Sequence, residues 1–256
     1  MIHKNEMFDN GEVILVDEQD KKRSGILRFV FTYIFSMDHK MIGRQYLFAG
    51  IFWALVGSGL SMIIRLQLGF PGVDLSSLKS ILGQGINQGR IDPDFYLAMV
   101  TMHGTIMIFF VLTGAFIGSL GNYIIPLQIG ARDMASGLIN MLSFWLYMLS
   151  GGILLVSFFL ETGPASSGWT AYPPLSALPE ASKGSGDGMT LWIISMVLFI
   201  VSTAMTAINF IATIINLRTK GMTFKRLPLT IWAFLFTAIL SLLSFPVLLA
   251  ALMLLF

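Results

Sequence analysis

The sequence predicts an all-α integral membrane protein with five membrane-spanning helices. Apolar residues make up 55% of the 256 residues, and charged residues make up only 12%. A soluble domain carries roughly 25% charged residues, so the composition is that of a membrane protein. Five apolar segments each approach or exceed the roughly 20 residues that a helix needs to cross a bilayer. These segments are 45–66, 93–120, 136–160, 189–217 and 228–256.

The N-terminal part differs from the rest of the chain. Residues 1–25 are polar and acidic and end in the basic cluster 21–23, which predicts a solvated tail and no signal peptide. Residues 26–37 are apolar and aromatic but too short to span a bilayer, so we expect them to lie at the membrane interface. The predicted organisation is therefore a cytoplasmic tail with an interfacial segment over 1–43 and a membrane domain over 44–256.

Lysine and arginine residues predict the orientation, because cytoplasmic loops carry an excess of them. The loops 69–92 and 161–188 together hold only Lys79, Arg90 and Lys183. We therefore expect these two loops outside, and the N-terminus inside, facing the cytoplasm or the mitochondrial matrix. The basic inner side holds Lys4, Lys21, Lys22, Arg23, Arg28, Lys40, Arg44, Arg132, Arg218, Lys220, Lys225 and Arg226.

Cysteine is absent. The chain alone therefore forms no disulfide, thiolate metal site, cysteine-attached haem or iron–sulfur cluster.

A histidine lies deep inside the second apolar segment. At about 1.5 Å per residue, His103 is roughly 15 Å along the helix from Pro93. An ionisable ring at that depth needs a proton donor, an ion or a metal as partner, and a hydrogen bond to a neighbouring helix is the plainer explanation. Tyr96 and Phe110 lie seven residues to either side, so α-helical geometry places the three on one face, where a flat aromatic ligand can lie.

The first apolar segment carries Arg65 near its outer end. Its side chain either snorkels to the interface or donates to a polar edge of a cofactor, and the sequence leaves both open. Gly50, Ala54 and Gly57 on the same segment indicate tight helix packing, with room for a flat ligand as the less common explanation.

Polar residues form a stripe along the fourth apolar segment. Their spacing places them on one face of a helix. Hydrogen bonds between helices are the expected role, and a hydrated proton track is the alternative. The stripe consists of Ser195, Ser202, Thr206, Asn209, Thr213 and Asn216.

The inner turn after the second segment holds Asp133 beside Arg132. A loop ion pair is one explanation. The other is an acid that collects protons at the mouth of an amide-lined cleft, because Asn122 and Asn140 flank the turn. In the outer loop, Trp169 fits an aromatic belt at the membrane interface.

The chain resembles the N-terminal part of subunit I of the haem-copper oxidases, most closely the cytochrome c oxidase type. Any one of the matching motifs is weak, but together they cover about residues 36–256 in the correct order. The motifs are Asp38-His39-Lys40-Met41-Ile42-Gly43, the segment from His103 to Phe110, Gly121-Asn122-Tyr123, the segment from Pro126 to Ala135, Ser143-Phe144-Trp145, Gly168-Trp169-Thr170, Tyr172-Pro173-Pro174-Leu175, Ala207-Ile208-Asn209-Phe210 and Thr213-Ile214.

The resemblance implies cofactor roles for four residues. His103 matches an axial ligand of the low-spin haem, and Arg65 matches the arginine that hydrogen-bonds the formyl group of haem A. Tyr96 matches a tyrosine near a propionate of the low-spin haem. Trp169 matches a tryptophan that donates to a propionate of the high-spin haem.

The resemblance also implies a proton route. Asp133 matches the acid at the entrance of the D pathway, and its amide-lined neck and upper polar residues match Asn122, Asn140, Ser202, Thr203 and Asn209. The family usually has two adjacent asparagines where this chain has Asn140-Met141, and many members have a cation-binding glutamate where it has Gln67.

As a family, the haem-copper oxidases are respiratory enzymes. The implied activity is electron transfer from cytochrome c through the low-spin haem to oxygen, coupled to proton pumping. The implied partners are oxidase subunits II and III, cytochrome c and lipid, with no nucleic acid. Quinol-oxidising members carry an arginine, an acid and a histidine where this chain has Val56, Leu60 and Phe95, which favours cytochrome c as donor.

The resemblance implies that this chain corresponds to the first five helices of the family's twelve-helix subunit I bundle. Two haems and a copper need about six histidines, and this chain has three. We therefore expect the high-spin haem and copper to be liganded elsewhere, by residues beyond Phe256 or by a companion chain.

Three alternatives stay open at this point: a quinol oxidase with haem B or haem O, a non-catalytic membrane scaffold, and a secondary transporter that uses the polar stripe. The expected location is the bacterial cytoplasmic membrane, with the mitochondrial inner membrane as the alternative.

Overall fold

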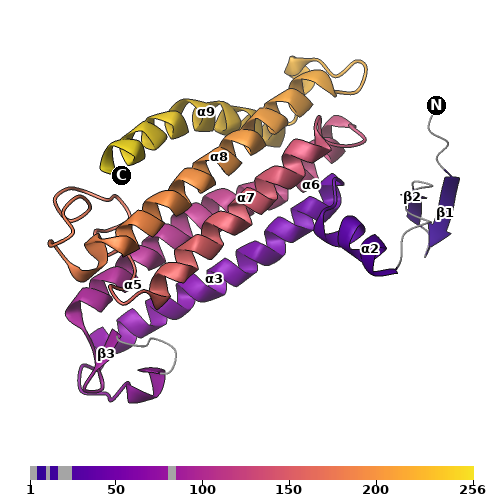
Figure 1. Ribbon diagram of the computed structural model, residues 1–256. Coiled ribbons are helices and arrows are strands. Elements are labelled where there is room, and N and C mark those ends of the chain that lie inside the picture. The colour runs from indigo at the N-terminus through magenta and orange to yellow at the C-terminus, as the bar shows by residue number, and fades with distance from the viewer. Residues whose placement is uncertain (1–4, 10–11, 17–24, 80–84) are drawn as a thin grey trace. The chain divides into compact units, whose positions relative to one another are not determined.

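A computed structural model describes residues 5–9, 12–16, 25–79 and 85–256. By its internal contacts the chain divides into two units, Met1–Met37 and Asp38–Phe256. The predicted basic cluster 21–23 lies outside the described residues. Figure 1 shows that helices dominate the structure.

The first unit contains a strand pair that the sequence analysis missed. Strands β1 (Asn5–Asp9) and β2 (Glu12–Val16) pair antiparallel, with Asp9 opposite Glu12. That the tail is solvated stays a prediction. The missed signal is Asn10-Gly11, a typical two-residue hairpin sequence, followed by a run of β-branched and aliphatic residues. The interfacial segment contains α2 (Gly25–Phe29) and a π-helix, η1 (Val30–Ile34).

Five helical segments in the second unit are long and apolar enough to cross a membrane, which confirms the predicted fold class. They are α3 (His39–Gly69); α5 (Pro93–Thr105) continued by η4 (Ile106–Phe116) and α6 (Ile117–Ile129); α7 (Gly137–Val156) with the 3₁₀ turn η5 (Ser157–Phe159); α8 (Asp187–Asn216); and α9 (Leu229–Leu255). The connecting segments contain η2 (Ser76–Leu78), β3 (Ile86–Asn87), β4 (Arg90–Ile91), η6 (Lys183–Ser185) and η7 (Phe224–Arg226).

Two helix boundaries differ from the prediction for identifiable reasons. Helix α3 begins at His39 instead of residue 45, because the Asp38 carboxylate accepts a hydrogen bond from the Met41 N–H and caps the helix. Helix α6 continues to Ile129 instead of ending near residue 120. It ends where Gly130 adopts a left-handed conformation (φ 71°), a common helix stop.

The second membrane segment changes from α-helix to π-helix after Thr105. Thr113 Oγ1 donates to the Ile108 carbonyl five residues back, at 2.9 Å, which matches the i→i+5 geometry of this segment. The wider turn rotates every residue beyond Ile106 relative to an α-helix. Phe110 is fully buried in an aromatic cluster with Trp53 and Phe199, and the predicted common face of His103 and Phe110 stays a prediction.

The core lies between the membrane helices, where α8 packs against both α7 and α9 (Figure 1). Its aromatic rings contact one another in series: Trp53 lies 5.1 Å from Phe110, and Phe110 lies 5.7 Å from Tyr147 between ring centroids. Glycines make room for these rings, since a Cβ on Gly151 would lie only 2.1 Å from Trp53 Cζ2.

The small residues of α3 allow tight helix packing, and the predicted room for a flat ligand stays a prediction. A Cβ on Gly57 would lie 2.7 Å from Met107 Sδ, which confirms tight packing at that position. Further along, Gly50 and Ala54 help to line an apolar hollow of about 230 Å³ between α3 and the η4–α6 segment.

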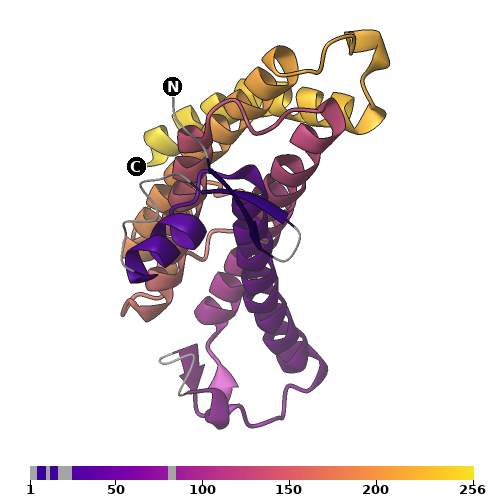
Figure 2. The same cartoon turned by 90° about the vertical axis from the view of Figure 1, so that its right-hand side faces the viewer.

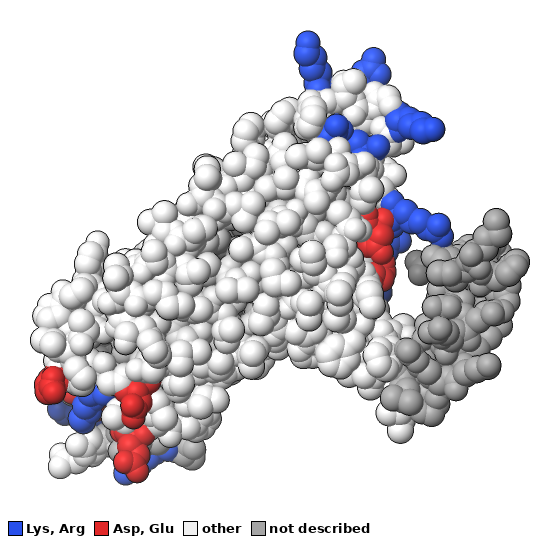
Figure 3. Space-filling model, turned by 45° about the horizontal axis from the view of Figure 1, so that its top comes forward, with Lys and Arg blue, Asp and Glu red and all other residues white. Residues whose placement is uncertain are grey.

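The chain reverses direction at two opposite ends of the helices. Figure 2 shows the loop between α8 and α9 at the upper end and the segment between α3 and α5 at the lower end. Charged side chains gather at these ends, and the body between them is nearly free of charge on the face shown in Figure 3. This distribution is typical of a protein that crosses a bilayer.

Candidate functional site

The His103 ring is held by a neighbouring helix. Its Nδ1 lies 2.8 Å from the carbonyl oxygen of Gly57 on α3. A carbonyl only accepts hydrogen bonds, so Nδ1 carries the proton and Nε2 presents its lone pair. The expected hydrogen bond between helices is therefore confirmed. It also fixes the ring in the way that a metal-ligating histidine is usually fixed by its other nitrogen.

The outer loop packs directly beside His103. A Cβ on Gly104 would lie 2.9 Å from Trp169 Cδ1, so only glycine allows this approach of the indole. Thr101 Oγ1 accepts a hydrogen bond from the Gly168 N–H at 2.9 Å and ties the loop to α5. The fold thus places Trp169 beside Gly104, the neighbour of His103 in the chain, although Trp169 lies 65 positions after Gly104 in the sequence.

Two other predicted cofactor contacts have less distinctive surroundings. Tyr96 is half-buried against the core on the first turns of α5. Arg65 is exposed near the outer end of α3, which fits both snorkelling and donation to a cofactor. The choice between the two roles of Arg65 stays open.

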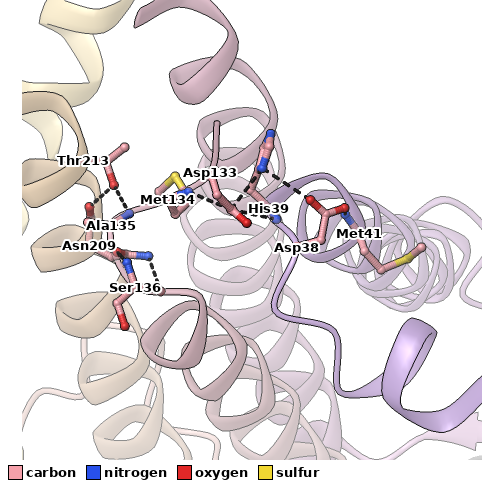
Figure 4. Close-up of polar contacts among 9 residues, drawn as sticks. All are labelled: Asp38, His39, Met41, Asp133, Met134, Ala135, Ser136, Asn209 and Thr213. Atoms are coloured by element: carbon pink, nitrogen blue, oxygen red, sulfur yellow. Dashed lines mark hydrogen bonds and ion pairs between the residues drawn. The ribbon is translucent and has the colours of Figure 1, made fainter. Parts of the chain in front are cut away.

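At the inner end of the helices, Asp133 lies against the first residue of α3. Its Oδ1 accepts from the His39 backbone N–H (3.3 Å) and from the Met134 N–H (2.7 Å), and lies 3.1 Å from His39 Nδ1. The ring of His39 is buried, whereas the carboxyl side chain of Asp133 is 45% exposed. Figure 4 shows that Asp133 reaches His39 rather than forming the expected loop ion pair with Arg132.

The turn that carries Asp133 is attached to α8. Asn209 binds both backbone groups of Ser136: its Oδ1 accepts from the N–H (2.9 Å) and its Nδ2 donates to the carbonyl (3.2 Å). Thr213 Oγ1 accepts from the Ala135 N–H at 2.9 Å (Figure 4). Asn209 therefore lies at the mouth beside Ser136, and not higher along the bundle as the resemblance implied.

Two fully buried asparagines lie above this mouth, and some of their polar atoms have no hydrogen-bond partner among the described residues. Asn122 Nδ2 donates to the Gly118 carbonyl at 2.8 Å, but its Oδ1 has no partner. Neither Oδ1 nor Nδ2 of Asn140 has one. An unsatisfied buried polar group costs about 1–3 kcal/mol, and such groups are normally satisfied by bound water.

A chain of hydroxyl contacts continues from Asn140. Ser143 Oγ donates to the Asn140 carbonyl (2.7 Å) and lies 3.3 Å from the Tyr46 hydroxyl. Ser202 Oγ donates to the Ser143 carbonyl at 2.6 Å, which joins α8 to α7. Beside it, Thr203 Oγ1 donates to the Phe199 carbonyl of its own helix.

The polar stripe of α8 largely has the predicted role. Ser195, Ser202, Asn209 and Thr213 make hydrogen bonds to α7 or to the turn before it, which confirms bonding between helices. Asn216 lies at the exposed end of the helix.

Sequence reasoning missed three residues of this polar series: His39, Tyr46 and Ser143. Two signals were available. Ser143 follows Asn140 by three residues and so shares its helix face. Tyr46 is a hydroxyl-bearing ring within an apolar segment, where such a group needs a partner.

One group of side chains has the chemistry to hold a metal ion. Ligand atoms of Asp38, His39 and Asp133 lie within 4.8 Å of one another. Exposed acidic groups often gather in this way without a metal, and the hydrogen bonds described above already account for the arrangement.

The fold and these two groups of residues define a multi-pass membrane protein with a histidine whose ring is fixed by a neighbouring helix, and with a series of buried polar residues near an acid at one end of the helices. A family model described as Cytochrome C and Quinol oxidase polypeptide I matches residues 41–256. The chain belongs to this family.

Relatives with established names are similar over most of the chain. The chain is 42% identical over 216 residues to the alternative cytochrome c oxidase subunit 1 of Bradyrhizobium diazoefficiens, covering 84% of this chain and 34% of the relative. It is 40% identical over 223 residues to cytochrome c oxidase subunit 1 of Thermostichus vulcanus (87% and 36%). It is 40% identical over 222 residues to the heme-copper oxidase subunit I+III of Aeropyrum pernix (87% and 25%). The chain thus spans between a quarter and two fifths of the length of these relatives.

Proposed function

We propose that this chain forms the N-terminal five helices of subunit I of a respiratory terminal oxidase, which passes electrons from cytochrome c to oxygen and translocates protons. The observation that carries the proposal is the His103 ring, whose Nδ1–H is bound to the Gly57 carbonyl so that Nε2 presents its lone pair. The family and the names of the relatives support the same function.

The residues around His103 fit a low-spin haem. His103 Nε2 is its proposed axial ligand, and bound haem supplies one-electron transfer. Tyr96, Arg65 and Trp169 are the proposed donors to the polar edges of haem groups, and haem A is the proposed type. The high-spin haem and copper are proposed to bind residues outside these five helices, because two haems and a copper need about six histidines and this chain has three.

Asp133 is the proposed proton entrance. Half of its carboxyl side chain faces solvent, and one oxygen is fixed by three contacts, which leaves Oδ2 to exchange protons with water. Asn122 and Asn140 are proposed to bind water above it, and Ser202 and Thr203 to continue the route. Asn209 supports the route by holding the turn at Ser136.

The proposed partners and membrane location of the chain follow from the same function. Its partners are the rest of subunit I, on this chain's continuation or on a companion chain, together with oxidase subunits II and III. One relative is named as a subunit I+III protein, which supports an association of these two parts. The proposed location is the bacterial cytoplasmic membrane.

The test uses the complex purified from its native membrane through a tag on this chain. We expect oxygen consumption with reduced cytochrome c, little with a quinol, and haem A in an acid–acetone extract. Activity with quinol and extraction of haem B or haem O would select the quinol oxidase instead. Absence of all haem from the complex would reject the oxidase function and leave a scaffold or transporter.

A further inference from the structure

Two buried threonines flank His103 on α5. The side chains of Thr101 and Thr105 lie inside the structure, with 1% and 0% of each residue exposed. Residues four apart in an α-helix share a face, whereas the residue midway between them lies nearly opposite. His103 therefore lies on one side of α5, where it bonds to the Gly57 carbonyl of α3, and the two threonines lie on the other side.

The two hydroxyl groups share one pattern of hydrogen bonds. Each donates to the carbonyl four residues back in its own helix: Thr101 Oγ1 to Leu97 and Thr105 Oγ1 to Thr101, both at 2.9 Å. A hydroxyl has one proton and two lone pairs, so each oxygen can still accept a hydrogen bond. Because the proton is bound to a carbonyl of the same helix, the lone pairs have a fixed direction relative to α5.

Two different elements supply the donors to these oxygens. The Gly168 N–H of the outer loop donates to Thr101 Oγ1 at 2.9 Å, and Trp192 Nε1–H of α8 donates to Thr105 Oγ1 at 3.0 Å. Trp192 is only 2% exposed, and a buried indole N–H needs an acceptor. The side of α5 away from His103 is therefore held by the outer loop at one point and by α8 at another.

The second of these points lies where the helix changes type. Thr105 is the last residue of α5, and the π-helix η4 begins at Ile106. The Ile106 N–H is shared between the carbonyls of Met102 and His103. The bond from Trp192 thus holds the α-helical part at the end where the wider π-helical turns begin.

We propose that Thr101 and Thr105 are positioning residues for His103, because their hydroxyls fix the rotation of α5 and therefore the direction of His103 Nε2. The Gly57 bond orients the ring about its own side-chain bonds, whereas the rotation of α5 sets where the side chain starts. Apolar packing is non-directional, but hydrogen bonds have a preferred geometry. The need of a buried indole for an acceptor would explain the Trp192 contact, but it does not explain a second threonine one turn away that is held by another element. The inference rests on the proposed function, in which Nε2 binds haem iron.

The test is the electron paramagnetic resonance spectrum of the oxidised complex, measured with haem per complex and unfolding temperature. The g-values of a ferric low-spin haem depend on the direction of its axial imidazole plane, so they report the orientation of His103 separately from stability. Thr105→Val and Thr101→Val each remove the acceptor and keep a side chain of similar size. We expect both variants to retain low-spin haem with shifted g-values, by more than the difference between wild type and the control Thr190→Val.

Thr190→Val is a matched control, because Thr190 is exposed and its hydroxyl donates to the Gly186 carbonyl at the start of the same helix. Thr105→Ser restores the hydroxyl and should give wild-type g-values. If Thr105→Val does not assemble or loses its haem, Trp192→Phe removes the same hydrogen bond from the donor side. Trp192→Phe should shift the g-values as well.

Wild-type g-values in haem-loaded Thr101→Val, Thr105→Val and Trp192→Phe would overturn the proposal, whatever the change in unfolding temperature. That result would show a purely structural role of the threonines and would leave the proposed function unaffected. Absence of low-spin haem from the wild-type complex would reject the proposed function, and the positioning role with it.

Discussion

The surroundings of His103 and of Asp133 differ in how each functional atom is held. Among the described residues, the His103 ring has one hydrogen bond, to the Gly57 carbonyl, and Trp169 packs beside the adjacent Gly104. Asp133 Oδ1 has three polar contacts, and two side chains of α8 hold the turn behind it. The first arrangement leaves one nitrogen for a ligand, and the second leaves one oxygen for water. A single contact is enough to orient a flat ring, whereas an exposed turn needs many contacts to keep its place.

Among the substitutions described here, removal of the Asp133 carboxylate is expected to lower turnover most. Asp133→Asn keeps the acceptor oxygen and the fold but cannot release a proton. We expect turnover to fall by about a hundredfold, the lower end of what a proton-transferring side chain contributes. The haem absorption spectrum should stay unchanged. Proton uptake and oxygen consumption of reconstituted complex measure the effect, with the exposed outer acid in Asp74→Asn as control. Normal turnover would remove Asp133 from the proton route.

A substitution of Asn140 tests whether its buried amide binds water on the proton route or stabilises the fold. Its two side-chain polar atoms have no hydrogen-bond partner among the described residues, so replacing it by leucine breaks no hydrogen bond between them. We expect Asn140→Leu to keep or raise the unfolding temperature and to lower turnover, because water loses its partners. Asn209→Leu should instead lower the unfolding temperature, since it breaks two bonds to Ser136. Unchanged turnover in Asn140→Leu would show that no proton passes it.

Two adjacent glycines of α7, one packed against Trp53 and one beside open space, provide a matched test of the core packing. A Cβ on Gly151 would lie 2.1 Å from Trp53 Cζ2, whereas nothing lies within 4 Å of one on Gly152. We expect Gly151→Ala to destabilise by about 1–3 kcal/mol through overpacking. Gly152→Ala should stabilise by roughly 0.5–1 kcal/mol through the entropy of the unfolded chain. Thermal unfolding of the two variants measures the difference, and equal unfolding temperatures would contradict the described packing.

The smallest effect is expected in the outer segment between α3 and α5. Hydrogen bonds from the Ser76 hydroxyl and N–H lower the pKa of Asp74 below its usual value near 4. The stabilisation is therefore present at neutral pH and is lost as the pH falls through the lowered pKa. Ser76→Ala should raise that pKa and reduce the difference in unfolding temperature between pH 7 and acid. An unchanged pH dependence would show that the hydroxyl does not stabilise the ionised carboxylate.

Much of the fold was predictable, because hydropathy and helical period report directly on burial. Five apolar segments and the polar stripe of the fourth were found this way, and Ser195, Ser202, Asn209 and Thr213 are indeed buried with partners on another element. Contacts between residues far apart in the sequence were harder to predict. The contact between His39 and Asp133 joins residues 94 positions apart and has no signal in local spacing.

The π-helix could also not be predicted from the spacing of apolar residues. Its residues, 106–116, are as apolar as the α-helix on either side, so only backbone geometry distinguishes them. The roles given to Tyr96, Arg65 and Trp169 came from the resemblance, and they stay predictions.

The most direct test of the account compares His103→Ala with His39→Ala in the assembled complex. Both remove an imidazole, but only the first removes the ring whose Nε2 is proposed to bind iron. The measurement is the reduced-minus-oxidised absorption spectrum together with haem per complex. The account predicts that His103→Ala loses the low-spin haem while His39→Ala keeps it. Full low-spin haem in a folded His103→Ala complex would contradict the account.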